Sequence, residues 1–409
     1  MTLKNFTLTF FSLLTFYSYG QLTIDAELRP RFEYRHGYKT LFPDDTESAT
    51  FVSQRTRLNT KFNKEKYTFF LSFQDIRTWG DTKQLAENSN SLAIHQAWAK
   101  VKFSSSFGVK LGRQEVIYDD SRIFGNVGWA QQARSHDMAL LQFADKDYKL
   151  DFGVAYNQDS QKLTGNLYSQ PSYKAFQYAW YHNKFGNVGA SFLLLNNGMQ
   201  DIDVEKIRYS QTLGTHLKFK LSEKINAATN LYYQTGKDAG NNDLSAYLAS
   251  IDLGFKLSDK SNLGFGAEIQ SGNDYDEADK NKAFTPFYGT NHKFNGFMDY
   301  FYVGNHGGNV GLIDIYGKFS TKLNDKSSLI AFIHKFNAAA EIGEDIDKQL
   351  GTEIDLVYKY NFSKDVNIAA GFSQMFASDG LEAVKGNSDG NLNNWGWLMV
   401  TIKPQLFSK

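Results

Sequence analysis

Apolar and polar residues alternate without interruption along residues 22–35. The apolar series occupies the even positions: Leu22, Ile24, Ala26, Leu28, Pro30, Phe32 and Tyr34. The odd positions carry Thr23 and then six charged residues: Asp25, Glu27, Arg29, Arg31, Glu33 and Arg35. Because a β-strand directs alternate side chains to opposite faces, this segment has one apolar face and one charged face. The wall of a membrane barrel with a polar lumen suits both faces.

The same alternation recurs as far as the end of the chain. It continues in residues 213–221, 247–257, 313–322, 353–360 and 398–403. Between these segments, tight charged turns such as 63–66 and 258–261 alternate with longer polar stretches such as 119–132 and 272–295. Short turns at one rim and long loops at the other are typical of an outer-membrane barrel. We therefore predict an all-β fold, an antiparallel transmembrane β-barrel of about 18 strands.

The sequence leaves two alternatives to this fold, a smaller barrel and a soluble all-β fold. The aromatic stretch at residues 294–303 fits either a loop or a strand, so a barrel of 16 strands is an alternative count. A soluble β-sandwich or propeller also contains many short strands, but a propeller shows a blade-length repeat that this sequence lacks. A dozen alternating segments with an aromatic apolar face favour the membrane barrel.

Composition narrows the class further. Aromatic residues make up 15% of the 409 positions and there are only 5 prolines, which suits many long strands. No internal run reaches 18 apolar residues, so membrane-spanning helices are excluded. The chain has no cysteine, which excludes disulfides, thiolate catalysis and thiolate metal sites.

The first 20 residues have the pattern of a secretory signal. Lys4 precedes an apolar stretch at 6–17, and Ser18 and Gly20 form a small-x-small cleavage site before Gln21. We therefore predict a signal peptide at 1–20 and a single barrel domain at 21–409. A secreted barrel implies the outer membrane of a Gram-negative bacterium, with membrane lipid as one partner.

Charge is balanced overall but unevenly distributed. The whole chain has 44 basic and 44 acidic residues, and removal of Lys4 with the signal leaves 43 and 44, a net charge of −1. This balance argues against a nucleic-acid partner. Nine of the ten arginines lie between Arg29 and Arg134, and the tenth is Arg208. The remaining positive charge is lysine, which is spread throughout the chain.

Five of these arginines share the polar face of the first two strand-like segments: Arg29, Arg31, Arg35, Arg55 and Arg57. The planar guanidinium binds carboxylates with two parallel hydrogen bonds. Several such groups along a water-filled lumen would form a track for polyanions. In the alternative interpretation, the arginines balance nearby acids and stiffen the wall. Those acids are Asp25, Glu27, Glu33 and Asp75.

A second cluster carries a family resemblance. Residues 112–115 read Gly-Arg-Gln-Glu, residues 120–125 read Asp-Ser-Arg-Ile-Phe-Gly, and Arg134 follows. These motifs, with the runs at 74–80 and 288–294, resemble the alginate-export outer-membrane porins. The resemblance implies an 18-stranded barrel with an arginine-lined constriction that passes anionic polysaccharide or oligosaccharide, and periplasmic partners for export or uptake. Carried over by position, Arg113 and Glu115 would lie at the constriction, and Arg77, Arg122 and Arg134 would line it.

Chemistry other than transport has little support in the sequence. Ser135, His136 and Asp137 are adjacent, so on a strand they point to alternate faces and cannot form one triad. No Gly-x-Ser-x-Gly elbow occurs, and we predict that the protein is not an enzyme. We predict no cofactor, although the acidic loop containing Asp274, Asp276 and Asp279 offers oxygen ligands for Ca²⁺. That loop lacks EF-hand spacing, and a solvated acidic loop is the alternative.

These observations lead to one functional hypothesis. We predict a passive channel that passes alginate-like anionic saccharides through a lumen lined by arginines. The pore-lining residues would be Arg29, Arg31, Arg55, Arg57, Arg77, Arg113, Glu115, Arg122 and Arg134. A general porin, whose arginines mainly balance acidic residues, is the alternative.

Overall fold

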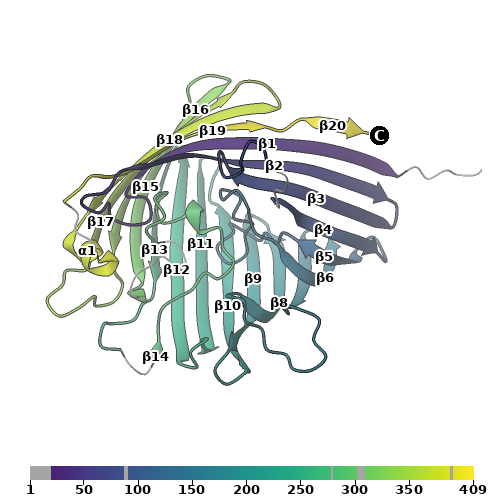
Figure 1. Cartoon of the computed structure of the whole chain (residues 1–409), viewed down its shortest axis with the longest axis horizontal. Helices are drawn as coiled ribbons and strands as arrows, with labels where there is room; N and C mark the ends of the chain where they lie inside the picture. Colours follow the sequence, from purple (N-terminus) through teal and green to yellow (C-terminus); the bar gives the residue numbers. More distant parts are fainter. Residues whose placement is uncertain (1–19, 87–90, 278–279, 302–308, 387–389) are drawn as a thin grey trace, which may run out of the picture.

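The computed structural model describes residues 20–86, 91–277, 280–301, 309–386 and 390–409. The predicted signal peptide falls almost wholly outside these residues. Eighteen long strands form the wall of the barrel (Figure 1). They are β1 (Gln21–His36), β2 (Ala49–Lys64), β3 (Tyr67–Thr78), β4 (Leu92–Lys102), β5 (Phe107–Gln114), β6 (His136–Asp145), β7 (Tyr148–Tyr156), β8 (Tyr173–Phe185), β9 (Val188–Asp201), β10 (Lys206–Lys220), β11 (Ile225–Lys237), β12 (Asp243–Lys256), β13 (Ser261–Gln270), β15 (Leu312–Lys322), β16 (Ser327–Asn337), β17 (Gln349–Asn361), β18 (Val366–Ala377) and β19 (Asn393–Ile402).

Four short elements complete the described structure. They are β14 (Lys280–Asn281), the 3₁₀ helix η1 (Asn291–Lys293), the helix α1 (Asp379–Lys385) and β20 (Gln405–Ser408). Within the described residues, no helix is long and apolar enough to cross a membrane.

The barrel closes where the first strand meets the last. β1 pairs antiparallel with β2 on one side and with β19 on the other, and all three lie side by side in Figure 1. On the β2 side Arg29 lies opposite Arg55, and on the β19 side Phe32 lies opposite Leu398. The predicted all-β antiparallel barrel of 18 strands is confirmed. Residues 294–301 form no strand, which removes the ambiguity in the count.

The two faces of the wall separate as the alternation predicts. Apolar side chains such as Phe69, Leu194 and Ile251 are about half exposed on the outside, at 45%, 55% and 50%. Polar and charged strand residues are buried instead, because they face the filled interior. In a bilayer the exposed apolar face would contact lipid tails, and the polar interior would stay away from them.

The two rims differ in the length of their connections. At one rim the turns are short, as at 65–66, 146–147 and 258–260. At the other rim most connections are long, but the links at 202–205 and 238–242 are short as well. We call these the short-turn rim and the long-loop rim.

Two long connections fold into the barrel instead of standing above it. The first is residues 115–135, between β5 and β6, and the second lies between β13 and β15, where the described residues are 271–277, 280–301 and 309–311. The first contacts β1 and β2 through residues 128–132, and it contacts Asn230 on β11 through Asp120. Since β11 lies about halfway around an 18-stranded barrel from β1, this segment crosses the lumen.

Candidate functional site

Four arginines on adjacent strands point into the lumen and form a group that we call the arginine clamp: Arg29 and Arg31 on β1, and Arg55 and Arg57 on β2. Arg29, Arg31 and Arg55 are only 7%, 5% and 5% exposed, and the Arg57 side chain is 10% exposed. The four side chains extend in parallel because each lies on the inward parity of its strand. The barrel wall therefore fixes their spacing.

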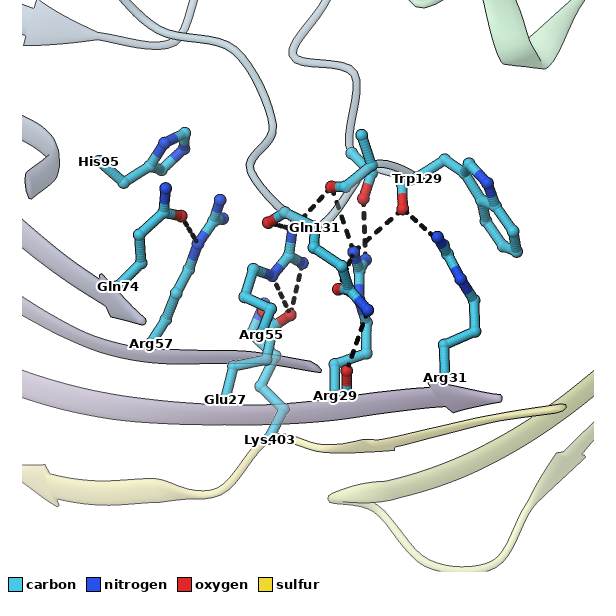
Figure 2. A network of polar contacts seen from close by, with 12 residues as sticks. Glu27, Arg29, Arg31, Arg55, Arg57, Gln74, His95, Trp129, Gln131 and Lys403 are labelled. Atoms are coloured by element: carbon cyan, nitrogen blue, oxygen red, sulfur yellow. Dashed lines mark hydrogen bonds and ion pairs between the residues drawn. The ribbon is translucent and has the colours of Figure 1, made fainter. Parts of the chain in front are cut away.

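The arginine clamp holds a short length of the first inward segment, residues 128–132, which we call the strap (Figure 2). Arg29 donates to the carbonyl oxygens of Gly128 and Trp129 at 2.8 and 3.1 Å, and Arg31 donates to Trp129 at 2.8 Å. Arg55 donates to the Gln131 carbonyl at 3.3 Å. All five carbonyl oxygens of the strap accept a hydrogen bond from the arginine clamp.

Side chains of the strap add to this anchoring. The Gln131 amide oxygen accepts from Arg29, and its amide nitrogen donates to the Ser53 hydroxyl at 3.0 Å. The Arg31 guanidinium lies over the Trp129 ring, 4.1 Å from its centroid, and the same ring stacks on His292 at 4.7 Å. Such a cation–π contact adds about 2 kcal/mol where water is excluded. The strap is thus tied to the wall by side-chain and backbone contacts.

Acidic residues neutralise the arginine clamp only in part. Glu27 accepts from Arg55 at 2.9 Å, and Glu33 accepts from Arg31 at 2.9 Å. Arg57 lies 4.0 Å from Glu115. For Arg29, by contrast, every hydrogen bond within the described structure goes to a neutral oxygen. Charge balance and loop anchoring therefore occur in the same cluster.

Glu115 fixes the point where the first inward segment leaves β5. Its carboxylate lies 2.7 Å from His95 Nε2 and accepts a hydrogen bond from Asn126 at 3.0 Å. Burial raises the pKa of Glu115, but hydrogen bonds from His95 and Asn126 and the charge of Arg57 outweigh it, and the pKa is lowered overall. Glu115 therefore carries its negative charge at neutral pH.

Arg122 lies deeper, where the first segment meets the far wall. It is 1% exposed, forms an ion pair with Glu268 on β13, donates to Asn295 at 3.2 Å and lies 4.0 Å from the Phe294 ring centroid. Its Nε and Nη1 atoms have no hydrogen-bond partner within the described structure. Arg122 therefore joins the two inward segments to the wall.

The two inward segments are also bonded to each other through their backbones. Gly125 N donates to Tyr288 O at 2.8 Å, and Thr290 N donates to Ser121 O at 2.9 Å. Arg134 donates to the carbonyl oxygen of Gly289 at 3.0 Å. The two segments therefore form one unit, and a displacement of one would disturb the other.

A cavity of about 1090 Å³ lies beneath this unit, toward the short-turn rim. One part of its lining is aromatic and apolar, and includes Trp129, Trp397, Phe297 and Phe332. Another part is charged, with the cations of Lys218, Lys293, Lys318 and Lys359 beside the carboxylates of Asp120, Asp252, Glu268 and Asp314. The cavity is thus large enough for a small ligand and offers it both apolar and charged contacts.

Three of these lysines have no acidic partner. Lys318 forms an ion pair with Asp252, whereas no carboxylate of the described residues lies within 4.0 Å of Lys218, Lys293 or Lys359. Lys293 donates to the backbone carbonyl of Asp120 at 2.8 Å. The cations of the second half of the wall are therefore lysines, and carboxylates such as Asp252, Glu268 and Asp314 lie among them. This agrees with the sequence, in which lysine supplies nearly all the positive charge after Arg134, and Lys218 and Lys359 lie on the polar parity of their strands.

Comparison with known proteins identifies the family of this barrel. The model of the alginate export family matches residues 20–394. The chain belongs to the alginate export family. Comparison with curated proteins gives no match.

Solved structures share the barrel of this chain at low sequence identity. OccAB4 of Acinetobacter baumannii matches with a TM-score of 0.66 and 12% identity, over 95% of this chain and 98% of that one. OpdL of Pseudomonas aeruginosa matches with a TM-score of 0.64 and 13% identity, over 94% and 99%. OpdK with vanillate, also of Pseudomonas aeruginosa, matches with a TM-score of 0.61 and 10% identity, over 94% and 98%. Family and fold together identify an outer-membrane β-barrel channel.

The structure does not bring all the predicted site residues together. Arg113 has the outward parity of Leu111 and bonds to Asp137 at 2.7 Å, with 42% of its side chain exposed. Arg77 likewise has the outward parity of Phe69 and bonds to Asp75 at 2.7 Å. Both lie apart from the inward group of Arg29, Arg31, Arg55, Arg57, Glu115, Arg122 and Arg134.

The acidic loop considered for Ca²⁺ is only partly described, because Asp279 lies outside the described residues. Asp274 accepts a hydrogen bond from Glu341 N at 2.9 Å. Among the described residues, no group of three His, Asp or Glu side chains is arranged to hold a metal ion.

Proposed function

We propose that this channel passes anionic saccharides, such as alginate-like polyuronates, by passive and electrostatically selected diffusion. The observation that carries the proposal is the cavity lined by Lys218, Lys293 and Lys359, none of which is paired with a carboxylate of the described residues. The carboxylates of Asp120, Asp252, Glu268 and Asp314 offset part of this charge. A cation without a close carboxylate in a partly enclosed cavity still attracts an anion, because the low-dielectric walls focus its field. The inward arginines Arg29, Arg31, Arg55, Arg57, Arg122 and Arg134, together with Glu115, belong to the same proposed conduction path.

The aromatic part of the cavity supports a saccharide as the anion. Trp129, Trp397 and Phe297 present ring surfaces close to the lysines. A pyranose ring has an apolar face of C–H groups that packs on aromatic rings, while its carboxylate needs a cation. Membership of the alginate export family supports the same class of ligand. The vanillate named with OpdK is a carboxylate joined to an apolar ring, which is a related chemistry.

Planar-bilayer recording of the purified channel tests the proposal. We expect a current that prefers anions and is blocked by trimannuronate but not by neutral mannotriose. In a triple variant with glutamine at Lys218, Lys293 and Lys359, the preference for anions and the block should fall together. The matched control replaces three lysines of the short turns, Lys146, Lys260 and Lys326, with glutamine. It removes the same number of charges and should keep both the preference for anions and the block.

A general porin is the alternative function. It is supported by the ion pairs that balance most of the arginine clamp, such as Arg55 with Glu27. A current with no ion preference and no block by trimannuronate would establish this alternative and refute the proposal.

A further inference from the structure

Two like charges face each other in the wall at the arginine clamp. Arg29 and Arg55 are directly opposite in the register of β1 and β2, and both are at most 7% exposed. Like charges at directly opposed strand positions repel each other. Glu27 compensates Arg55, whereas Arg29 is met only by neutral oxygens of the described residues. Within the described structure, the wall therefore holds a buried guanidinium, Arg29, that forms no hydrogen bond to a carboxylate, and the nearby carboxylate of Glu27 is bonded to Arg55 instead.

The strap meets the Arg29 guanidinium with neutral oxygens, which are weaker hydrogen-bond acceptors than a carboxylate. Its partners for Arg29 are the carbonyl oxygens of Gly128, Trp129 and Ala130 and the amide oxygen of Gln131. A carboxylate carries a full negative charge and fits the guanidinium fork with both its oxygens, which a single neutral carbonyl oxygen cannot do. A carboxylate that reached Arg29 would therefore compete well with the strap.

A carboxylate in the cavity would lie next to this position, with only the strap between them. Gly128 and Trp129 line the cavity and also bond to Arg29 through their carbonyl oxygens. The strap is thus the boundary between the cavity and the arginine clamp. An anion held by the lysines of the cavity lies on one side of the strap, with Arg29 on the other.

We propose that Arg29 and Arg55 form an anion-binding site that the strap occupies at rest, and that a carboxylated saccharide displaces the strap from it. The row of strap carbonyl oxygens substitutes for the oxygens of the ligand. Trp129 of the strap stacks on His292, and the residues on both sides of the strap are bonded to the second inward segment, so displacement of the strap opens the unit that crosses the lumen. The choice of a saccharide rests on the proposed function, while the anion site itself rests only on the geometry of the arginine clamp.

The absence of cysteine allows a direct measurement of strap position. Spin labels are attached at Gln132→Cys in the exposed end of the strap and at Lys66→Cys in a short turn. Double electron–electron resonance then gives the distance between them in liposomes, with trimannuronate as the probe and mannotriose as the neutral control. We expect trimannuronate alone to lengthen or broaden the distance distribution.

Variants separate ligand binding from simple anchoring. Arg29→Gln should loosen the strap at rest and weaken the response to trimannuronate by about tenfold or more. Arg29→Lys keeps the charge without the fork, and should loosen the strap while losing less of the response; it also serves if Arg29→Gln does not fold. The matched control Arg77→Gln removes an outward arginine and should leave both the resting distance and the response unchanged.

The outcomes are distinct from those of the proposed function. A strap that does not move at saturating trimannuronate overturns this inference, even if the bilayer current is anion-selective and blocked. An equal response in Arg29→Gln and the parent chain also overturns it. A strap that moves with trimannuronate and loses that response in Arg29→Gln supports it, even if the current shows no ion preference and the proposed function fails.

Discussion

The Glu27–Arg55 pair allows the energetics of the arginine clamp to be measured. Glu27 Oε1 lies 2.9 Å from Arg55 Nε and 2.5 Å from Nη2, and the two side chains are 8% and 6% exposed. Arg55 also donates to the strap carbonyl of Gln131 at 3.3 Å, and Glu27 lies 3.9 Å from Lys403. The perturbation is a double-mutant cycle of Glu27→Gln and Arg55→Gln.

The structure sets the expected magnitudes. Glu27→Gln leaves Arg55 buried without its carboxylate, which costs about 3 kcal/mol, the lower end for a broken buried pair. Arg55→Gln costs about 2 kcal/mol through the loss of hydrogen bonds to the strap. It costs only about 1 kcal/mol more for the Glu27 carboxylate left behind, because Lys403 still lies near that carboxylate. The double variant loses the hydrogen bonds to the strap and the attraction of Glu27 to its other neighbouring cations. It leaves neither member of the pair as a buried charge without a partner, and it costs about 3 kcal/mol. The cycle should therefore be non-additive by about 3 kcal/mol.

Urea unfolding of the protein in lipid vesicles, followed by tryptophan fluorescence, measures the four free energies of unfolding. The matched control is the cycle of Asp75→Asn and Arg77→Gln, an ion pair of the outer face whose side chains are 17% and 33% exposed. That pair should couple by no more than about 1 kcal/mol. Additivity at Glu27 and Arg55 within about 0.5 kcal/mol would refute the account of the arginine clamp as a buried, mutually dependent network.

Three further predictions follow from the same geometry. In Gly289→Ala the new methyl group would overlap the Arg122 carbonyl, so the two inward segments should separate and single-channel conductance should rise; an unchanged conductance would contradict this. Glu115 has a pKa below the 4.5 usual for glutamate, so its contribution is complete above that pH and is lost as pH falls through its own lowered pKa. Strap mobility, measured by spin label, should therefore rise only below about pH 4.5, and a rise between pH 7 and 5 would count against this role. Arg113→Gln, which removes an outward pair with Asp137, should leave ion selectivity unchanged in bilayer recordings.

The wall of the barrel could be predicted because its information is local. Side chains alternate with period two, so the apolar and charged faces of a segment such as 22–35 are visible within one strand. The strap could not be found in this way. Its hydrogen bonds to Arg29 join residues 99–102 positions apart, and no periodicity relates the two. An inward-folded loop and an external loop have the same polar composition.

Local parity also outperformed motif position within the candidate site. Arg77 shares the odd-numbered parity of Phe69, and Arg113 that of Leu111, so the alternation alone places both on the outside. The family motif instead suggested a constriction for each. The lysines of the second half show the same point, since Lys218 and Lys359 occupy the polar face of strands that the pattern had identified.

Arginine and lysine occupy different places in the lumen, and their chemistry explains the difference. A guanidinium has five donors in a rigid plane and is weakly hydrated, so it can hold several carbonyl oxygens in a buried place, as Arg29 does with the strap. An ammonium is a strongly hydrated point charge on a flexible stem, and it holds an ion in a wet cavity without fixing its orientation. Arginine is therefore concentrated where the chain is held, and lysines such as Lys218 and Lys359 line the cavity that we propose as the ligand path. A channel needs both, because an anion bound everywhere as firmly as the strap would not leave.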